Sequence, residues 1–271
     1  MKRLFAASIF LMVIFVLSAV QPCPAQGTED LLDDLKITVI YDNYLAAEGL
    51  KTDWGFSCLI EGGEKTILFD TGTKGDILMH NMKALKIDPK KVDVVIISHD
   101  HGDHYGGLPA FLNEKSDVTV YMLKSFSQGT KNIVINAGAE LIEVTESVKV
   151  CNGIYITGEI KGPANEEGII LRTSKGSIIL TGCAHPGIDK IVKASKNLID
   201  DKILYVMGGF HLLQTPKESV EKIISSFRDM GVKYVSATHC TGDNSIKLFR
   251  DAFKENFIPV GAGKILTLSD F

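Results

Sequence analysis

The sequence has no Cys-x-x-Cys pair, no cluster of basic residues, and no internal repeat or low-complexity tract among its 271 residues. Without paired cysteine spacing, a zinc site built from cysteines is not expected. The chain carries 29 Lys and Arg against 33 Asp and Glu, and this slightly acidic balance argues against nucleic acid as a partner. Because nothing resembling a linker interrupts residues 35–271, we expect them to form one continuous domain.

A long apolar run occurs at the N-terminus. Lys2 and Arg3 precede an uncharged stretch, residues 4–20, and Ala25 follows at a plausible cleavage position. This pattern predicts a secretory signal peptide over residues 1–25, a periplasmic or secreted mature protein, and no stable membrane association after cleavage. The alternative is an uncleaved membrane anchor, since about 17 apolar residues lie just inside the spanning range.

The hydrophobic pattern predicts an α/β fold with two sheets flanked by helices. Short apolar runs and turn residues predict strands over residues 36–41, 56–61, 65–69, 92–97, 168–172, 177–181, 203–207, 232–237 and 264–268. Apolar residues at helical spacing predict helices over residues 75–85, 187–198, 216–230 and 244–253.

Three of the seven histidines fall within the segment SHDHGDHYGGL, residues 98–108, directly after a continuous apolar strand. Imidazole suits zinc, and a carboxylate adds negative charge to such a site. Alternate residues of an extended segment point the same way, so His99, His101 and Asp103 are expected to converge, leaving His104 for a second ion close by. A polar surface loop with incidental histidines is the less favoured alternative.

The remaining histidines support the same interpretation. His185, His211 and His239 each lie just beyond the carboxyl end of a predicted strand, beside glycine-containing loops. Ligands of α/β sheets collect at those strand ends. The alternative for each is a loop histidine that serves only packing, and His80 is expected to be an exposed helix residue.

The order of these motifs resembles the metallo-β-lactamase superfamily. The HxHxDH motif spans residues 99–104, an FDTG element precedes it at 69–72, and TGCAH and THCTG follow at 181–185 and 238–242. The chain is most similar to the branch that includes dihydropterin-ribofuranosylaminobenzene-phosphate synthases, through residues 55–57, 181–188 and 208–212. The resemblance implies a metallo-β-lactamase αββα sandwich over residues 35–271.

The resemblance also implies a set of roles. One metal ion would be held by His99, His101 and His185, and the other by Asp103, His104 and His239. Asp70 would lie beneath the site and orient a ligand, although an Asp-Thr-Gly at a strand end is also an ordinary turn. Zinc is the expected metal, as one or two ions, with iron or manganese as alternatives.

One segment departs from the pattern of dinuclear relatives. Many of these carry an aspartate that bridges both metals, but the corresponding segment here, VMGGFHLL at residues 206–213, contains no carboxylate. Either the second metal is held more weakly, or His211 enters the site, as a substrate contact or as a replacement ligand. Cys183 and Cys240 are expected mainly to fill space, as are Trp54 and Tyr105.

These features favour a metal-dependent hydrolase acting on a small ester, thioester, amide or phosphoester. Zinc lowers the pKa of a coordinated water to near 7, which would supply hydroxide at neutral pH. Asp103 is expected to accept a hydrogen bond or proton from this nucleophile, and His211 to contact the substrate. The alternatives are a pterin-type condensing enzyme and a non-catalytic metal-binding protein, and neither the substrate nor the oligomeric state follows from the sequence.

Overall fold

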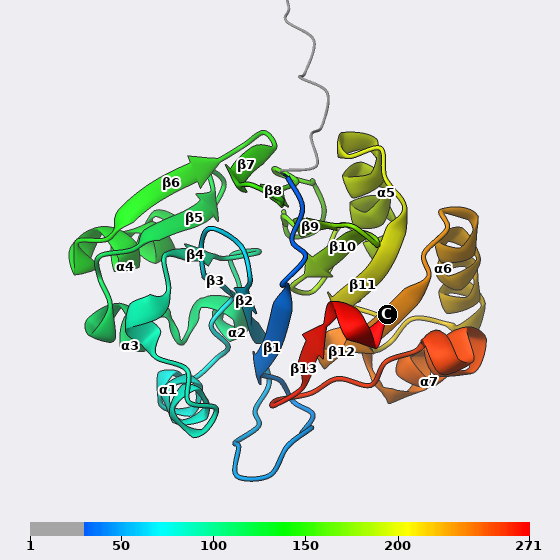
Figure 1. Cartoon of the computed structure of the whole chain (residues 1–271), viewed down its shortest axis with the longest axis horizontal. Helices are drawn as coiled ribbons and strands as arrows, with labels where there is room; N and C mark the ends of the chain where they lie inside the picture. The colour runs from blue at the N-terminus through cyan, green and yellow to red at the C-terminus, as the bar shows by residue number, and fades with distance from the viewer. Residues whose placement is uncertain (1–29) are drawn as a thin grey trace, which may run out of the picture.

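The computed structural model describes residues 30–271, and the predicted signal peptide lies outside this range. None of the helices in the described range combines the length and apolar composition needed to cross a membrane. Within it the chain forms two stacked sheets with helices on both outer faces (Figure 1). The α/β class and the helix–sheet–sheet–helix order expected from the sequence are therefore confirmed.

The first sheet has seven strands in the order β13-β1-β2-β3-β4-β5-β6. Their bounds are β1 Lys36–Tyr41, β2 Ser57–Glu61, β3 Ile67–Phe69, β4 Val94–Ile96, β5 Thr119–Leu123, β6 Glu140–Val144 and β13 Ile265–Thr267. Strands β3, β4, β5 and β6 pair in parallel, so their carboxyl ends lie at one edge.

The second sheet has six strands in the order β12-β11-β10-β9-β8-β7. Their bounds are β7 Val148–Cys151, β8 Ile154–Ile156, β9 Ile169–Thr173, β10 Gly176–Thr181, β11 Ile203–Gly209 and β12 Tyr234–Thr238. Here β10, β11 and β12 pair in parallel and also end at a common edge.

The helices lie outside the sheets (Figure 1). They are α1 Gly75–Ala84, α2 Gly102–Tyr105, α3 Leu108–Glu114, α4 Gln128–Ala137, α5 Ile188–Leu198, α6 Lys217–Asp229 and α7 Asp243–Phe253. α1, α3 and α4 flank the first sheet, and α5, α6 and α7 flank the second. The short α2 instead lies at the strand ends, beside the histidine motif.

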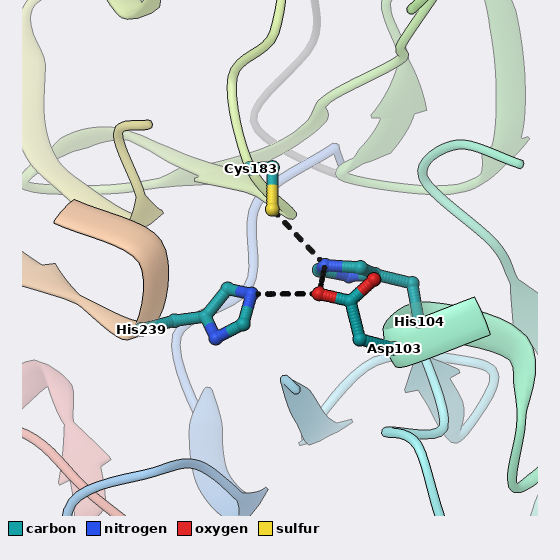
Figure 2. Close-up of side chains that lie close together, drawn as sticks. All are labelled: Asp103, His104, Cys183 and His239. Atoms are coloured by element: carbon teal, nitrogen blue, oxygen red, sulfur yellow. Dashed lines mark hydrogen bonds and ion pairs between the residues drawn. The ribbon is translucent and has the colours of Figure 1, made fainter. Parts of the chain in front are cut away.

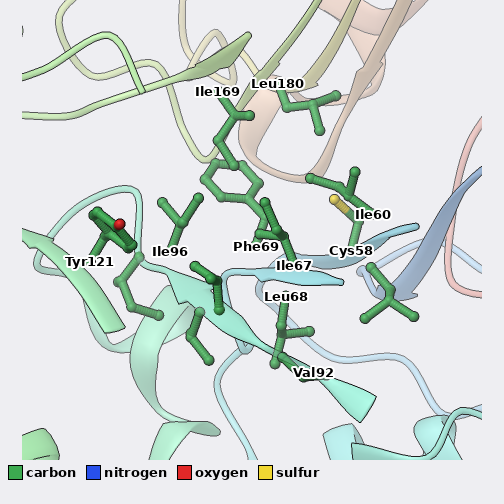
Figure 3. Close-up of a cluster of buried hydrophobic side chains, with 14 of the residues drawn as sticks. Cys58, Ile60, Ile67, Leu68, Phe69, Val92, Ile96, Tyr121, Ile169 and Leu180 are labelled. Atoms are coloured by element: carbon green, nitrogen blue, oxygen red, sulfur yellow. The ribbon is translucent and has the colours of Figure 1, made fainter. Parts of the chain in front are cut away.

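Apolar side chains from both sheets fill the space between them (Figure 3). Phe69 and Ile96 of the first sheet and Ile169 and Leu180 of the second are fully buried in this cluster. Burying apolar surface on this scale stabilises the sandwich at roughly 25 cal/mol per Å². A second cluster lies between the second sheet and α5, α6 and α7.

The region between residues 115 and 160 contains elements that the sequence pattern did not predict. Strand β6 is only partly buried, so its alternation is weak. Helix α4 buries Thr130, Lys131 and Val134 rather than a continuous apolar stripe. Its ends are nevertheless ordinary, since Ser127 accepts a hydrogen bond from the Thr130 amide and Gly138 is left-handed with φ 78°.

Candidate metal centre

Five loops from the carboxyl ends of parallel strands meet where the two sheets adjoin. The loops after β3 and β4 supply Asp70 and the histidine motif, and those after β10, β11 and β12 supply His185, His211 and His239. The packing of one sheet on the other therefore brings together residues that lie far apart in the sequence, as expected for ligands at strand ends.

The first group of donor atoms comes from His99, His101 and His185, whose ligand atoms all lie within 4.8 Å of one another. Nε2 of His99 lies 3.1 Å from Nδ1 of His101. The ring of His185 lies 4.7 Å from that of His99 and 4.6 Å from that of His101, measured between centroids. The structure thus brings together the three residues assigned to one metal by resemblance.

The second group contains Asp103, His104 and His239, and it also contains Cys183 (Figure 2). Oδ2 of Asp103 lies 3.5 Å from Nε2 of His104 and 3.3 Å from Nε2 of His239. The sulfur of Cys183 lies 3.1 Å from Nε2 of His104. The rings of His99 and His104 are 4.2 Å apart, so the two groups adjoin.

The prediction that Asp103 converges with His99 and His101 on an extended segment is wrong. The chain turns into helix α2 at Gly102, so the alternation of side chains stops after His101. Asp103 and His104 are consecutive residues of this helical turn, and both contribute to the second group. The grouping implied by the resemblance is the one that the geometry supports.

Two imidazole nitrogens identify this region as a place for a cation. Nε2 of His185 and Nε2 of His239 are buried and have no hydrogen-bond partner among the described residues. The 3.3 Å contact between His239 and Asp103 does not have hydrogen-bond geometry. Because an unpartnered buried polar atom is costly, nitrogen atoms aimed at a carboxylate and other imidazoles fit a divalent metal ion.

Asp70 and Ser98 orient two of these histidines. Asp70 accepts hydrogen bonds from the Ser98 amide and hydroxyl, and its Oδ2 lies 2.6 Å from Nδ1 of His104. Since the Ser98 hydroxyl donates its one proton to Asp70, it accepts from Nδ1 of His99, 2.9 Å away. Both contacts leave the Nε2 atoms facing the site, as in carboxylate–histidine–metal arrangements.

Two supporting residues were not predicted from the sequence. Asn43 accepts a hydrogen bond from Nδ1 of His239 at 2.8 Å and donates to its carbonyl at 3.1 Å. Glu166 is fully buried and accepts hydrogen bonds from the Thr181 hydroxyl and from the four backbone amides of residues 182–185, at 2.8–3.0 Å. A single carboxylate therefore holds the whole loop that presents His185.

The backbone is strained at the site. Six non-glycine residues in the described range have positive φ, and four of them are Asp70, Ala184, His211 and His239. This left-handed conformation costs about 1–3 kcal/mol for most residues and persists where the surroundings enforce it. The concentration of this conformation in the loops at the site indicates that they serve a functional site, because the conformation itself costs stability.

The charges of the site are arranged in a pattern that suits a cation. Burial lowers the pKa of His99 well below its ordinary value and that of His185 to about 3, so both imidazoles are neutral. Burial also opposes the charge on Asp103 and His104. The imidazoles of His104 and His239 beside Asp103 nevertheless lower its pKa, and the carboxylates of Asp70 and Asp103 raise that of His104 to about 10.

His211 and Trp54 lie at the rim. The ring of His211 is exposed and lies 4.2 Å from that of His185, so His211 faces the site as expected. Trp54 is 44% exposed and its ring lies 4.9 Å from that of His239. Trp54 therefore lines the rim of the site, whereas Tyr105 packs against the core as expected.

Comparison with known proteins agrees with the geometry. Residues 55–189 match the model of the metallo-beta-lactamase superfamily. The chain is 30% identical to the 7,8-dihydropterin-6-methyl-4-(beta-D-ribofuranosyl)-aminobenzene-5'-phosphate synthase of Methanocaldococcus jannaschii, over 87% of this chain and 97% of that protein.

Solved structures give the same result. A crystal structure described as a metal-dependent hydrolase of the beta-lactamase superfamily is 27% identical, with a TM-score of 0.74, over 86% of this chain and 99% of that one. Human tRNase Z, short form, is 13% identical with a TM-score of 0.56, over 86% and 99% of the two chains, and shows likeness of fold alone.

Proposed function

Because this chain belongs to the metallo-β-lactamase superfamily, we propose that it is a metal-dependent hydrolase of a small ester, thioester, amide or phosphoester. The observation that carries the proposal is the pair of adjoining donor groups, in which the buried Nε2 atoms of His185 and His239 have no hydrogen-bond partner within residues 30–271. The donors are mainly imidazoles with one carboxylate, a set that favours zinc, with iron or manganese as alternatives.

The residues of the chain would have distinct tasks in hydrolysis. When bound, a divalent ion acidifies water and polarises the oxygen of a carbonyl or phosphoryl group. Asp103 stays ionised, so its carboxylate can hold the ion and also accept a hydrogen bond or proton from the attacking water. Asp70, Ser98 and Asn43 hold the imidazoles in the orientation that this requires.

The rim would bind the substrate. His211 is exposed beside His185 and is placed to hydrogen-bond a substrate oxygen. The exposed ring of Trp54 next to His239 offers an apolar face for a flat or aliphatic part of the substrate.

A second candidate function is a pterin-type condensing reaction, and the M. jannaschii synthase is the observation that favours it. The signal peptide proposed for residues 1–25 argues the other way, because phosphorylated pterin precursors are cytoplasmic metabolites. A third candidate, a metal-binding protein without catalysis, would be favoured by a bound metal with no open coordination position. Mass spectrometry of the mature protein from the cell envelope would test export, and an intact Met1 would contradict it.

The hydrolase proposal is tested on protein loaded with zinc, iron or manganese in turn. A panel of ester, thioester, lactam and phosphodiester substrates is assayed, with the His101→Ala variant as a matched control. Metal-dependent turnover that this variant loses would support hydrolysis. Metal binding without turnover of any substrate would favour the other two candidates, and absence of metal binding would exclude the proposal.

A further inference from the structure

We propose that Cys183 is a metal ligand, and that its thiolate completes the donor group of Asp103, His104 and His239. The inference rests on the metal binding in the proposed function and goes beyond it, because it assigns a ligand that the sequence motifs did not. It also identifies an anionic donor in place of the carboxylate that residues 206–213 lack.

Two of the distances between donor atoms fall in the range of a four-coordinate site, and a third is slightly shorter. A tetrahedral ion with ligands about 2.0–2.3 Å away places them about 3.3–3.7 Å from one another. Oδ2 of Asp103 lies 3.3 Å from the nitrogen of His239 and 3.5 Å from that of His104. The sulfur of Cys183 lies 3.1 Å from the same His104 nitrogen, and all four donor atoms lie within 4.8 Å.

Two further observations point to an ion among these atoms rather than to packing. Nε2 of His239 is buried and aimed at this group, yet no hydrogen-bond partner for it occurs in the part of the chain that the structure describes. Cys183 itself is only 3% exposed, and its sulfur faces His104 rather than the apolar core (Figure 2). A thiol that only filled space would be expected to contact apolar side chains.

The last two residues of β11 leave no room for a carboxylate, and the sulfur of Cys240 lies in that space. A Cβ at Gly209 would lie 2.6 Å from the Gly182 carbonyl and 2.6 Å from the sulfur of Cys240. A Cβ at Gly208 would lie 2.1 Å from the Thr181 carbonyl. An aspartate therefore does not fit at either position without a backbone shift. A coordinated thiol loses its proton, so Cys183 supplies the anionic donor from another loop.

Cys240 is the natural control. Its sulfur lies 3.2 Å from that of Cys183 and donates a hydrogen bond to it. Cys240 is not in the donor group of Asp103, His104 and His239, and could hold an ion only in a different group, with Cys183 and His211. Cys240→Ser keeps a hydroxyl donor at this position. Cys183→Ser removes the sulfur from the donor group with a change of similar size.

The test uses cobalt(II) as the probe, because a cobalt–thiolate bond gives a charge-transfer band in the near ultraviolet. Cobalt-loaded wild-type protein and Cys240→Ser should show the band, and Cys183→Ser should lose it. Persistence of the band in Cys183→Ser, or its loss in Cys240→Ser, would overturn the assignment. Failure to bind cobalt at all would instead count against the proposed function.

A measurement on the unsubstituted protein covers the case in which a variant does not fold. X-ray absorption of the zinc-loaded wild type should show a sulfur neighbour at about 2.3 Å beside nitrogen and oxygen neighbours at about 2.0–2.2 Å. A spectrum fitted by nitrogen and oxygen alone, with the second group occupied, would overturn the inference while leaving metal binding intact.

Discussion

The carboxylate of Asp70 lies 2.6 Å from Nδ1 of His104, and neither side chain has exposed surface. This contact makes Nδ1 the nitrogen of His104 that keeps its proton when Nε2 binds a metal ion. Nδ1 donates to Asp70, and Nε2 is left to face Asp103 and Cys183. Asp70 of the FDTG element therefore orients His104, which lies 34 residues further along the chain.

Replacing Asp70 by asparagine should weaken the second donor group. The amide presents an N–H where His104 needs an acceptor, so the imidazole tautomer or orientation changes. Loss of such a supporting contact typically costs about 10–100-fold in metal affinity. Competition with a chromophoric chelator measures the affinity, and Asp76→Asn on the exposed face of α1 is the matched control. Equal affinities in the two variants would contradict this role.

Removing ligands from the two donor groups should affect different ions. His101→Ala should deplete the ion held with His99 and His185, and His239→Ala should deplete the ion held with Asp103 and His104, because the groups are separate. Metal titration followed by elemental analysis of each variant distinguishes the two losses. The same pattern of loss in both variants would show that the groups do not bind separate ions.

His211→Ala should lower turnover far more than metal content. Its ring is exposed next to His185, where a substrate would approach. Loss of one general acid–base group costs about 10²–10⁴-fold in rate. The variant is assayed on the best substrate of the panel, and its metal is measured in the same preparation. Release of a bound ion would identify His211 as a ligand, and no change in either quantity would make it a packing residue.

Glu166→Gln should destabilise the protein and loosen the loop that carries His185. The carboxylate accepts five hydrogen bonds, and an amide cannot accept from the His185 backbone N–H with its nitrogen. Leaving a buried donor unsatisfied costs about 1–3 kcal/mol. Urea unfolding measures the loss, with the exposed Glu146→Gln as control. A free energy of unfolding equal to that of the control would mean that the loop does not depend on its hydrogen bonds to Glu166.

Because the folded protein keeps a proton on Asp42, the free energy of unfolding should fall as the pH rises from about 4 to 7. Burial raises the pKa of Asp42 from 3.8 to about 7, in a position where Tyr44 and Thr238 donate to its oxygens. The folded protein therefore binds a proton that the unfolded chain releases above about pH 4. This contribution is fully present below pH 4 and is lost as the pH rises through 7.

Asp42→Asn should remove that part of the pH dependence. Unfolding of metal-free protein by urea at pH 5 and pH 8 gives the difference in stability for each form. The difference should be smaller in the variant than in the wild type. An unchanged difference would mean that Asp42 is already ionised at pH 5 in the folded state.

Local patterns in the sequence were sufficient for most of the fold. Buried strands such as β4 and β11 are continuous apolar runs, and α6 has apolar residues at helical spacing, so each predicts its own structure. The histidine motif after β4 was recognisable for the same reason, since its donors are adjacent in the chain. The segment around α4 and β6 was missed because partial burial leaves no clear period.

The division of donors between two groups was decided by tertiary structure. The helical turn at α2 directs Asp103 away from His101 and toward His239, which extended alternation could not anticipate. Cys183, Glu166 and Asn43 reach the site only because loops from both sheets converge there. Sequence patterns report what one segment does by itself, whereas a metal site depends on distances between segments, and those are fixed only when the two sheets pack together.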